Sequence, residues 1–322
     1  MKYLGLDLLK GIAAFFIVGC HLRMAETSAA EALLHFCNMF VGVFGAISGF
    51  LLAGSMQKYR KLSEVMVRRL HRFVPLYFSW SLLYVIVSWG FGFMQEDSTK
   101  IERLSNLDYW LSVVFYGGSS CHLWYLSALI YSTFVIVCLE GVLRAMGKNR
   151  NIVFVGWLWL VVGGIVIYAS TCFGRAHWAI YELRLLGFML TGVGIYRWGR
   201  EAKSDLMPLT LCVGGGAIVM HITLAGILPA FVRDWLVVVP LVLLFSRLNF
   251  PQLEKLSCIL SRYSLGVYLW HPIFAAILYV ILNWLLPHPY GPIVVLADWV
   301  TCYCLALVVT SASKRTWLKR FE

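Results

Sequence analysis

Three ionisable residues lie at different depths in the first hydrophobic stretch of the chain, which runs from Leu4 to Leu22. Asp7 and Lys10 lie near its start, and His21 lies near its end. On a helix, the spacing from Lys10 to His21 is three turns, about 16 Å of rise, and returns to nearly the same face. Ionisable residues inside an apolar span are costly to bury and usually mark functional sites. The pattern indicates a polar path along this helix. The alternative is a solvated pair of Asp7 and Lys10 at the helix end, with His21 reaching the interface.

A basic cluster lies in the segment from Met56 to Phe78, which we expect to be the longest cytoplasmic loop. Arg68, Arg69, His71 and Arg72 end just before the next apolar span. Arg69 and Arg72 are three positions apart and would share one face of a helix. Because guanidinium groups bind phosphate oxygens bidentately, the cluster predicts a phosphate-binding surface. Such clusters also flank many membrane spans purely as topology signals.

Four residues expected near the opposite, outer surface are candidates for binding an acceptor molecule. His122 and Trp124 begin one apolar span, and Glu182 and Arg184 open another. Aromatic residues at such places are also ordinary members of the interfacial belt. Glu182 and Arg184 could equally pair with each other. Position alone leaves both interpretations open.

Two polar residues lie deeper in apolar spans. Ser48 lies among glycines that allow close helix approach, so packing is its expected role, with lining of a polar path as the alternative. His271 precedes Pro272, which removes a backbone donor from its helix. A buried histidine is more often part of a satisfied hydrogen-bonded network than a catalyst. We therefore expect His271 to be chiefly structural.

The composition predicts a polytopic membrane protein. The 322 residues are 60% hydrophobic and 13% charged, against about 25% charged in ordinary soluble domains. The 13 tryptophans and 16 tyrosines suit two interfacial aromatic belts. The first span has no small-residue cleavage site and has charges at its start, so we do not expect a cleaved signal peptide.

We expect one all-α domain over residues 1–322, a bundle of about ten transmembrane helices. The short apolar stretch at 108–121 is expected to be interfacial or re-entrant. The predicted spans lie near 4–24, 33–56, 73–94, 122–143, 151–171, 182–198, 206–226, 231–248, 264–284 and 291–311.

The distribution of positive charge predicts that both termini are cytoplasmic. With the N-terminus inside, 21 of the 27 lysines and arginines fall on the cytoplasmic side and 6 on the other. This bias explains most of the net charge of +11, so nucleic acid is not an expected partner. A basic inner face suits anionic lipids or a phosphorylated cofactor. The nine cysteines form no Cys-x-x-Cys pair, so neither a metal site nor a disulfide framework is expected. A bridge between Cys121 and Cys172 stays open.

Together these segments resemble the acyltransferase-3 family of integral membrane acyltransferases over essentially the whole chain. Each motif is loose, and their order on ten spans makes the resemblance specific. The matching features are Asp7, Lys10 with the following His21, ISGFLLA at 47–53, RRLHRFVPLY at 68–77, HLWYLSALI at 122–130, GFMLTGVGIYRW at 187–198 and YSLGVYLWHP at 263–272.

The resemblance implies transfer of an acyl group, commonly acetyl, from cytoplasmic acyl-coenzyme A to a hydroxyl of an extracytoplasmic acceptor. Typical acceptors are surface polysaccharide, lipopolysaccharide or peptidoglycan, and the expected location is the bacterial cytoplasmic (inner) membrane. In the family, the basic residue and the histidine of the first helix are functionally required, which maps onto Lys10 and His21. The basic pair of the loop maps onto Arg69 and Arg72.

These expectations assign roles to individual residues. His21 would act as general base for the acceptor hydroxyl, with Asp7 as a second catalytic candidate. Acyl-coenzyme A would be held by Lys10, Ser48, Arg68, Arg69 and Arg72. The glycan or glycolipid acceptor would be bound by His122, Trp124, Glu182 and Arg184.

A second hypothesis uses the same polar path for a different purpose. The chain would be a binding or transport module for a small polar solute, such as the membrane part of a serine racemase-like resistance protein. It predicts coupling to a solute gradient and no need for acyl-coenzyme A. A homodimer stays open under either hypothesis.

Overall fold

The chain is described by a computed structural model that covers residues 3–21, 28–94, 105–115, 122–147, 152–170, 179–201, 230–285 and 292–314. Within these ranges the regular elements are all helical. The chain forms two compact units. The first comprises Met1–Ser48 and Gly199–Glu322, and the second is Gly49–Trp198.

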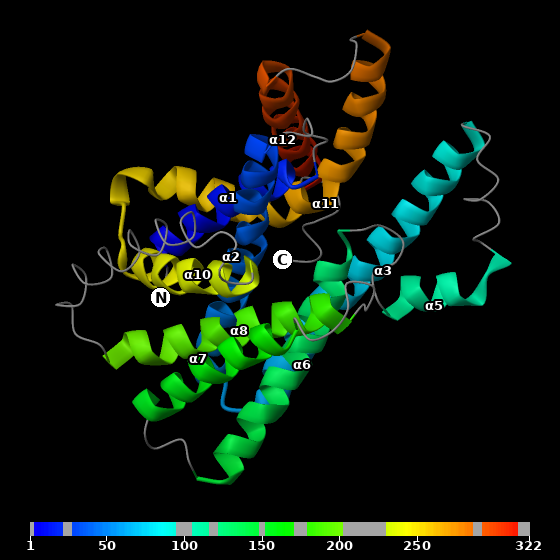
Figure 1. Cartoon of the computed structure of the whole chain (residues 1–322). Helices are drawn as coiled ribbons and strands as arrows, with labels where there is room; N and C mark the ends of the chain where they lie inside the picture. The colour runs from blue at the N-terminus through cyan, green and yellow to red at the C-terminus, as the bar shows by residue number, and fades with distance from the viewer. Residues whose placement is uncertain are drawn as a thin grey trace. The chain divides into compact units, whose positions relative to one another are not determined.

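The first unit is built around α1 (Leu4–Gly19), which packs against several other helices. Among them are α10 (Ala230–Arg247), α11 (Glu254–Leu285) and α12 (Pro292–Lys314), and α11 also packs along α12 (Figure 1). The short 3₁₀ helix η4 (Pro251–Leu253) leads into α11. The first part of α2 (Ser28–Lys58) completes the unit.

Most of α1 is buried because small residues let neighbouring helices approach it closely. A methyl group at Gly5 would collide with the backbone carbonyl of Phe245 on α10, and one at Gly19 would collide with the Trp299 ring on α12. Such close approach at small residues is typical of packing between membrane helices. Polar side chains on α1 are therefore held among other helices.

Aromatic side chains fill the core of the first unit. The Phe15 ring stacks on Trp299 with centroids 5.0 Å apart, and the Phe16 ring stacks on Phe40 at 4.3 Å. The Trp299 indole Nε1 donates a hydrogen bond to the carbonyl of Phe15 over 2.8 Å, so its polar atom is satisfied. These contacts fix α1 against both α12 and α2.

The second unit contains the end of α2 together with α3 (Leu62–Met94), α5 (Leu107–Phe115), α6 (Trp124–Ala145), α7 (Ile152–Ala169) and α8 (Ala179–Glu201). Helices α3 and α6 pack against each other. A methyl group at Gly49 would collide with the backbone of Met189, so α2 and α8 approach closely there. The packing role expected of the glycine-rich end of the second span is confirmed at this position.

Five described helices are long and apolar enough to cross a membrane: Leu33–Lys58, Leu62–Gly90, Trp124–Ala145, Pro251–Leu285 and Ile293–Ser313. A shorter apolar helix lies at Val155–Ala169. The expectation of an all-helical protein with several membrane spans is confirmed. The number of ten spans and the location of the termini stay predictions.

Several expectations fall wholly or partly outside the described residues. They include the predicted span at 206–226, the bridge between Cys121 and Cys172, and the end of the stretch 108–121. The first part of that stretch forms α5, whose Val113 carbonyl accepts a hydrogen bond from the Tyr77 hydroxyl over 2.5 Å.

The expected long loop between Met56 and Phe78 is wrong. Helix α2 continues to Lys58 and α3 begins at Leu62, so only three residues separate the two helices. The segment is helical because Val65 and Phe73, eight positions apart, are buried on one face of α3. The arginine cluster therefore lies on a helix.

Candidate active site

The imidazole rings of His21 and His271 lie next to each other in the first unit. Their centroids are 4.9 Å apart and their planes are tilted by 47°. His271 lies on α11 and is fully buried, and His21 is half-buried. The position of His271 within its span predicts that it lies deeper in the membrane than His21, but rings 4.9 Å apart lie at about the same level.

His21 follows α1 in a tight turn. The helix ends at Gly19, and the amides of Cys20 and His21 donate to the carbonyls of Ile17 and Val18, each over 3.1 Å. These bonds reach back three residues, as in a 3₁₀ turn, so the regular helix ends two residues before His21. That His21 lies on the same face as Lys10 stays a prediction. The tertiary contact with α11 positions the ring.

The backbone of α11 fixes the tautomer of His271. Its Nδ1 lies 3.2 Å from the carbonyl oxygen of Val267, one turn earlier. A carbonyl oxygen only accepts, so Nδ1 must carry the hydrogen and donate it. In the neutral imidazole the lone pair is then on Nε2. The backbone carbonyl of His271 also accepts a hydrogen bond from the Cys302 thiol over 3.3 Å.

The other end of α1 is tied to α11 as well. The Ser261 hydroxyl donates to the Asp7 carboxylate over 2.7 Å. Asp7 therefore meets α11 near its start, and His21 meets it farther along, so the two helices run in the same direction. The Lys10 ammonium lies 5.9 Å from the centroid of the Phe44 ring on α2.

The basic cluster in the second unit lies on the first turns of α3, next to the end of α2. The guanidinium of Arg69, which is half-buried, lies 3.4 Å from the hydroxyl of Ser55. The Arg68 guanidinium lies 4.8 Å from the centroid of the Tyr59 ring. Arg68 and Arg72 are exposed on α3.

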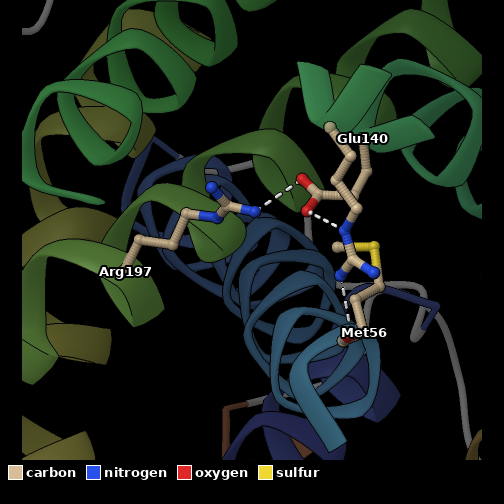
Figure 2. A network of polar contacts seen from close by, with 4 residues as sticks. Met56, Glu140 and Arg197 are labelled. Atoms are coloured by element: carbon tan, nitrogen blue, oxygen red, sulfur yellow. Dashed lines mark hydrogen bonds and ion pairs between the residues drawn. The ribbon is translucent and has the colours of Figure 1, made fainter. Parts of the chain in front are cut away.

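The second unit contains a buried charge network that the sequence motifs do not predict. Glu140 on α6 is fully buried, and its carboxylate accepts from Arg197 on α8 over 2.5 Å and from Arg144 over 3.0 Å. Arg144 also donates to the carbonyl of Met56 over 2.8 Å, near the end of α2. Figure 2 shows the Arg197 guanidinium facing the Glu140 carboxylate, with Met56 nearby. The signal available in the sequence was a lone carboxyl group inside an apolar span.

The residues expected to bind an acceptor all belong to the second unit. His122 is buried and its ring packs on Tyr84, with centroids 4.5 Å apart. The Trp124 ring lies 5.2 Å from that of Tyr181, which brings the start of α6 to the start of α8. Glu182, the next residue on α8, has a buried Oε2 with no hydrogen-bond partner among the described residues. Arg184 lies half-buried on the same helix.

The residues expected to bind acyl-coenzyme A are divided between the units. Lys10 and Ser48 belong to the first unit, where both are half-buried. Arg68, Arg69 and Arg72 belong to the second. That these five residues meet one ligand stays a prediction.

Comparison with known proteins gives one match. A family model described as an acyltransferase domain, that of the acyltransferase-3 family, matches residues 3–313. No curated protein and no solved structure matches the chain. Since the match extends over nearly all of the sequence and both units, the chain belongs to the acyltransferase-3 family.

Proposed function

We propose that the protein is a membrane O-acyltransferase that uses cytoplasmic acyl-coenzyme A, most simply acetyl-coenzyme A, as donor. The acceptor is a hydroxyl of a surface glycan or glycolipid on the other side of a bacterial inner membrane. The observation that carries this proposal is the arrangement along α1, where Asp7 contacts α11 at one end and His21 contacts it at the other. Polar groups that recur along a buried helix support a path from one membrane face toward the other.

The donor would enter from the side of the basic cluster. The exposed guanidiniums of Arg68 and Arg72 suit the phosphates of coenzyme A, with half-buried Arg69 beside them. Lys10 and Ser48 stay predicted donor-binding residues. Each arginine can bind two phosphate oxygens at once, which a single ammonium group does less well.

His21 would act as the general base in the transfer step. Its imidazole takes the proton from the acceptor hydroxyl as the oxygen attacks the carbonyl carbon of the thioester. The bond between carbon and sulfur then breaks, and the coenzyme A thiolate leaves with the proton returned by His21. The products are an acyl ester and free coenzyme A.

Asp7 would act on the position of α1 and not on the reacting atoms. The helical rise from Asp7 to Gly19 is about 18 Å, too far for contact between the Asp7 carboxylate and an acceptor at His21. Its hydrogen bond from Ser261 instead fixes the start of α1 against α11. His122, Trp124, Glu182 and Arg184 stay the predicted acceptor-binding residues.

The test compares surface glycans from cells with and without the protein by mass spectrometry. Loss of an O-acyl group from one glycan, and its return on re-expression, is the expected result. Purified protein in proteoliposomes should then consume acetyl-coenzyme A loaded on the basic side. The proposal fails if acylation is identical in both cells and the thioester is not consumed. Uptake of a solute along its gradient without any thioester would favour the transport hypothesis, which the family match disfavours.

A further inference from the structure

His271 has a place in the protein that a purely structural histidine does not require. Its ring is fully buried on α11, and the carbonyl of Val267 in the same helix satisfies its Nδ1. If His271 were purely structural, the hydrogen bond from Nδ1 to its own helix would be the only contact that its ring needs. Its centroid nevertheless lies 4.9 Å from that of His21, the residue to which the transfer chemistry is assigned.

The bond to Val267 determines what His271 can offer to its neighbour. Because Nδ1 donates to the backbone, the neutral ring has its acceptor lone pair on Nε2. A second imidazole is a suitable donor to that lone pair. A histidine whose one ring nitrogen donates to a neighbouring acceptor is fixed in one tautomer, with the other nitrogen available as a base.

We propose that His271 is a positioning residue for His21: a small rotation of the two adjacent rings lets the His21 imidazole donate a hydrogen bond to Nε2 of His271. This contact fixes the tautomer and direction in which the other nitrogen of His21 faces the acceptor hydroxyl. When His21 takes the acceptor proton, Nε2 of His271 stabilises the imidazolium that forms. The inference rests on the proposed function and replaces the structural role expected for His271.

The local structure on both sides of the pair supports a fixed geometry. His21 follows a tight turn at the end of α1, and α1 is held against α11 by the bond between Asp7 and Ser261. On the other side, the Cys302 thiol of α12 donates to the backbone carbonyl of His271. The backbones of both histidines are therefore held in place by contacts that do not depend on a ligand.

Two substitutions separate the functions of the two ring nitrogens. In His271→Asn, the side-chain amide takes the place of Nδ1 and can still donate to the carbonyl of Val267, but nothing occupies the place of Nε2. In His271→Gln, the amide oxygen takes the place of Nε2 and can still accept from His21. If His271 is purely structural, the asparagine variant should retain more activity. If His271 positions His21, the glutamine variant should retain more.

Both variants are purified in proteoliposomes, normalised to folded protein, and assayed for kcat and for KM with acetyl-coenzyme A. We expect His271→Asn to lower kcat roughly 10- to 100-fold with little change in KM, as loss of a hydrogen bond to a charged group would. His271→Gln should keep most of kcat. His35, which is exposed on α2 in the same unit, provides the matched control, and His35→Asn should leave kcat unchanged. Equal kcat in the two His271 variants, or better activity with asparagine, overturns the proposal.

A second measurement tests the pairing independently of acyl transfer. Diethyl pyrocarbonate modifies unprotonated imidazole nitrogens, and mass spectrometry gives the rate at each histidine. We expect the rate at His21 to change at least severalfold in His271→Asn and to stay near the wild-type rate in His271→Gln. An unchanged rate at His21 in both variants overturns the pairing. If the wild-type protein transfers no acyl group while the labelling rates differ as expected, the proposed function fails and the pairing stands.

Discussion

Glu140 and Arg197 form an ion pair inside the second unit, with 2.5 Å between the carboxylate oxygen and the guanidinium nitrogen. Both side chains are almost fully buried, and Arg144 contributes a second guanidinium to the same carboxylate. Breaking a buried ion pair by removing one partner leaves the other charge uncompensated, which is costly. The pair joins α6 to α8, so its loss should affect the stability of the unit.

We expect Glu140→Ala to lower the free energy of unfolding by about 3–5 kcal/mol, because two buried or half-buried guanidiniums lose their counter-charge. The measurement is thermal unfolding in detergent, followed by tryptophan fluorescence. Glu64→Ala provides a matched control, since Glu64 is exposed near the start of α3 and its loss should shift the Tm only slightly. Equal Tm values for the two variants would show that the pair does not stabilise the fold.

His21→Ala should give a folded protein that binds acyl-coenzyme A and transfers little of the acyl group. Loss of a positioned general base removes typically about 10²–10⁴-fold in rate. The measurement is kcat per folded molecule, with donor binding determined separately by calorimetry. His35→Ala should retain full turnover. Near-normal turnover by His21→Ala would remove His21 from the chemistry.

Replacing Arg69 and Arg72 together with glutamine should weaken acyl-coenzyme A binding. Each charge-assisted contact with a phosphate is worth about 1.5–3 kcal/mol, so the double variant should lose several kcal/mol of binding free energy. In the wild-type protein, binding should also weaken as salt is added. The measurement is calorimetric titration with a non-hydrolysable acyl-coenzyme A analogue.

The control for this double variant removes the same amount of charge nearby. Arg60 and Lys61 are both exposed between α2 and α3, so their replacement with glutamine tests the effect of net charge alone. We expect this control to lose much less binding free energy. If both double variants bind equally well, Arg69 and Arg72 act only as topology signals.

The turn between α2 and α3 should lie in the cytoplasm, together with both termini. Since α1 and α11 run in the same direction, an odd number of crossings must separate them, and the predicted spans supply seven. In intact cells, Lys61→Cys should be protected from a membrane-impermeant maleimide, and Trp284→Cys at the far end of α11 should be labelled. The label is assigned to its site by mass spectrometry. Labelling at position 61 in intact cells would reverse the predicted orientation.

The sequence by itself determined the class of the protein. A chain that is 60% hydrophobic and 13% charged, with apolar stretches of about 20 residues, is typical of membrane-spanning helices, which satisfy their own backbone. The order of short motifs around His21, Arg69 and His122 was sufficient to identify the family, which the match over residues 3–313 confirms. These properties depend on composition and local order, which a linear sequence contains directly.

Local features also gave partly wrong boundaries. Hydropathy placed a loop where α3 continues through Arg68 and Arg72, because charged residues on one face hide an apolar face that includes Val65 and Phe73. In the same way, the helical spacing predicted that the first helix continues past Gly19, where the structure has a tight turn. In both places, the backbone conformation differs from what the local pattern of polar and apolar residues predicts.

Only the tertiary structure decided which polar groups meet. Asp7 and Ser261 are 254 positions apart, and Glu140 and Arg197 are 57 apart. No periodic pattern connects positions so distant, so their pairing depends on which helices pack together and in which register. The same reason explains why the contact of His271 could not be predicted. In the sequence it is a single histidine before a proline, and the packing of α11 places it against His21. A buried polar group takes its role from the group that satisfies it, and here that group lies on another helix.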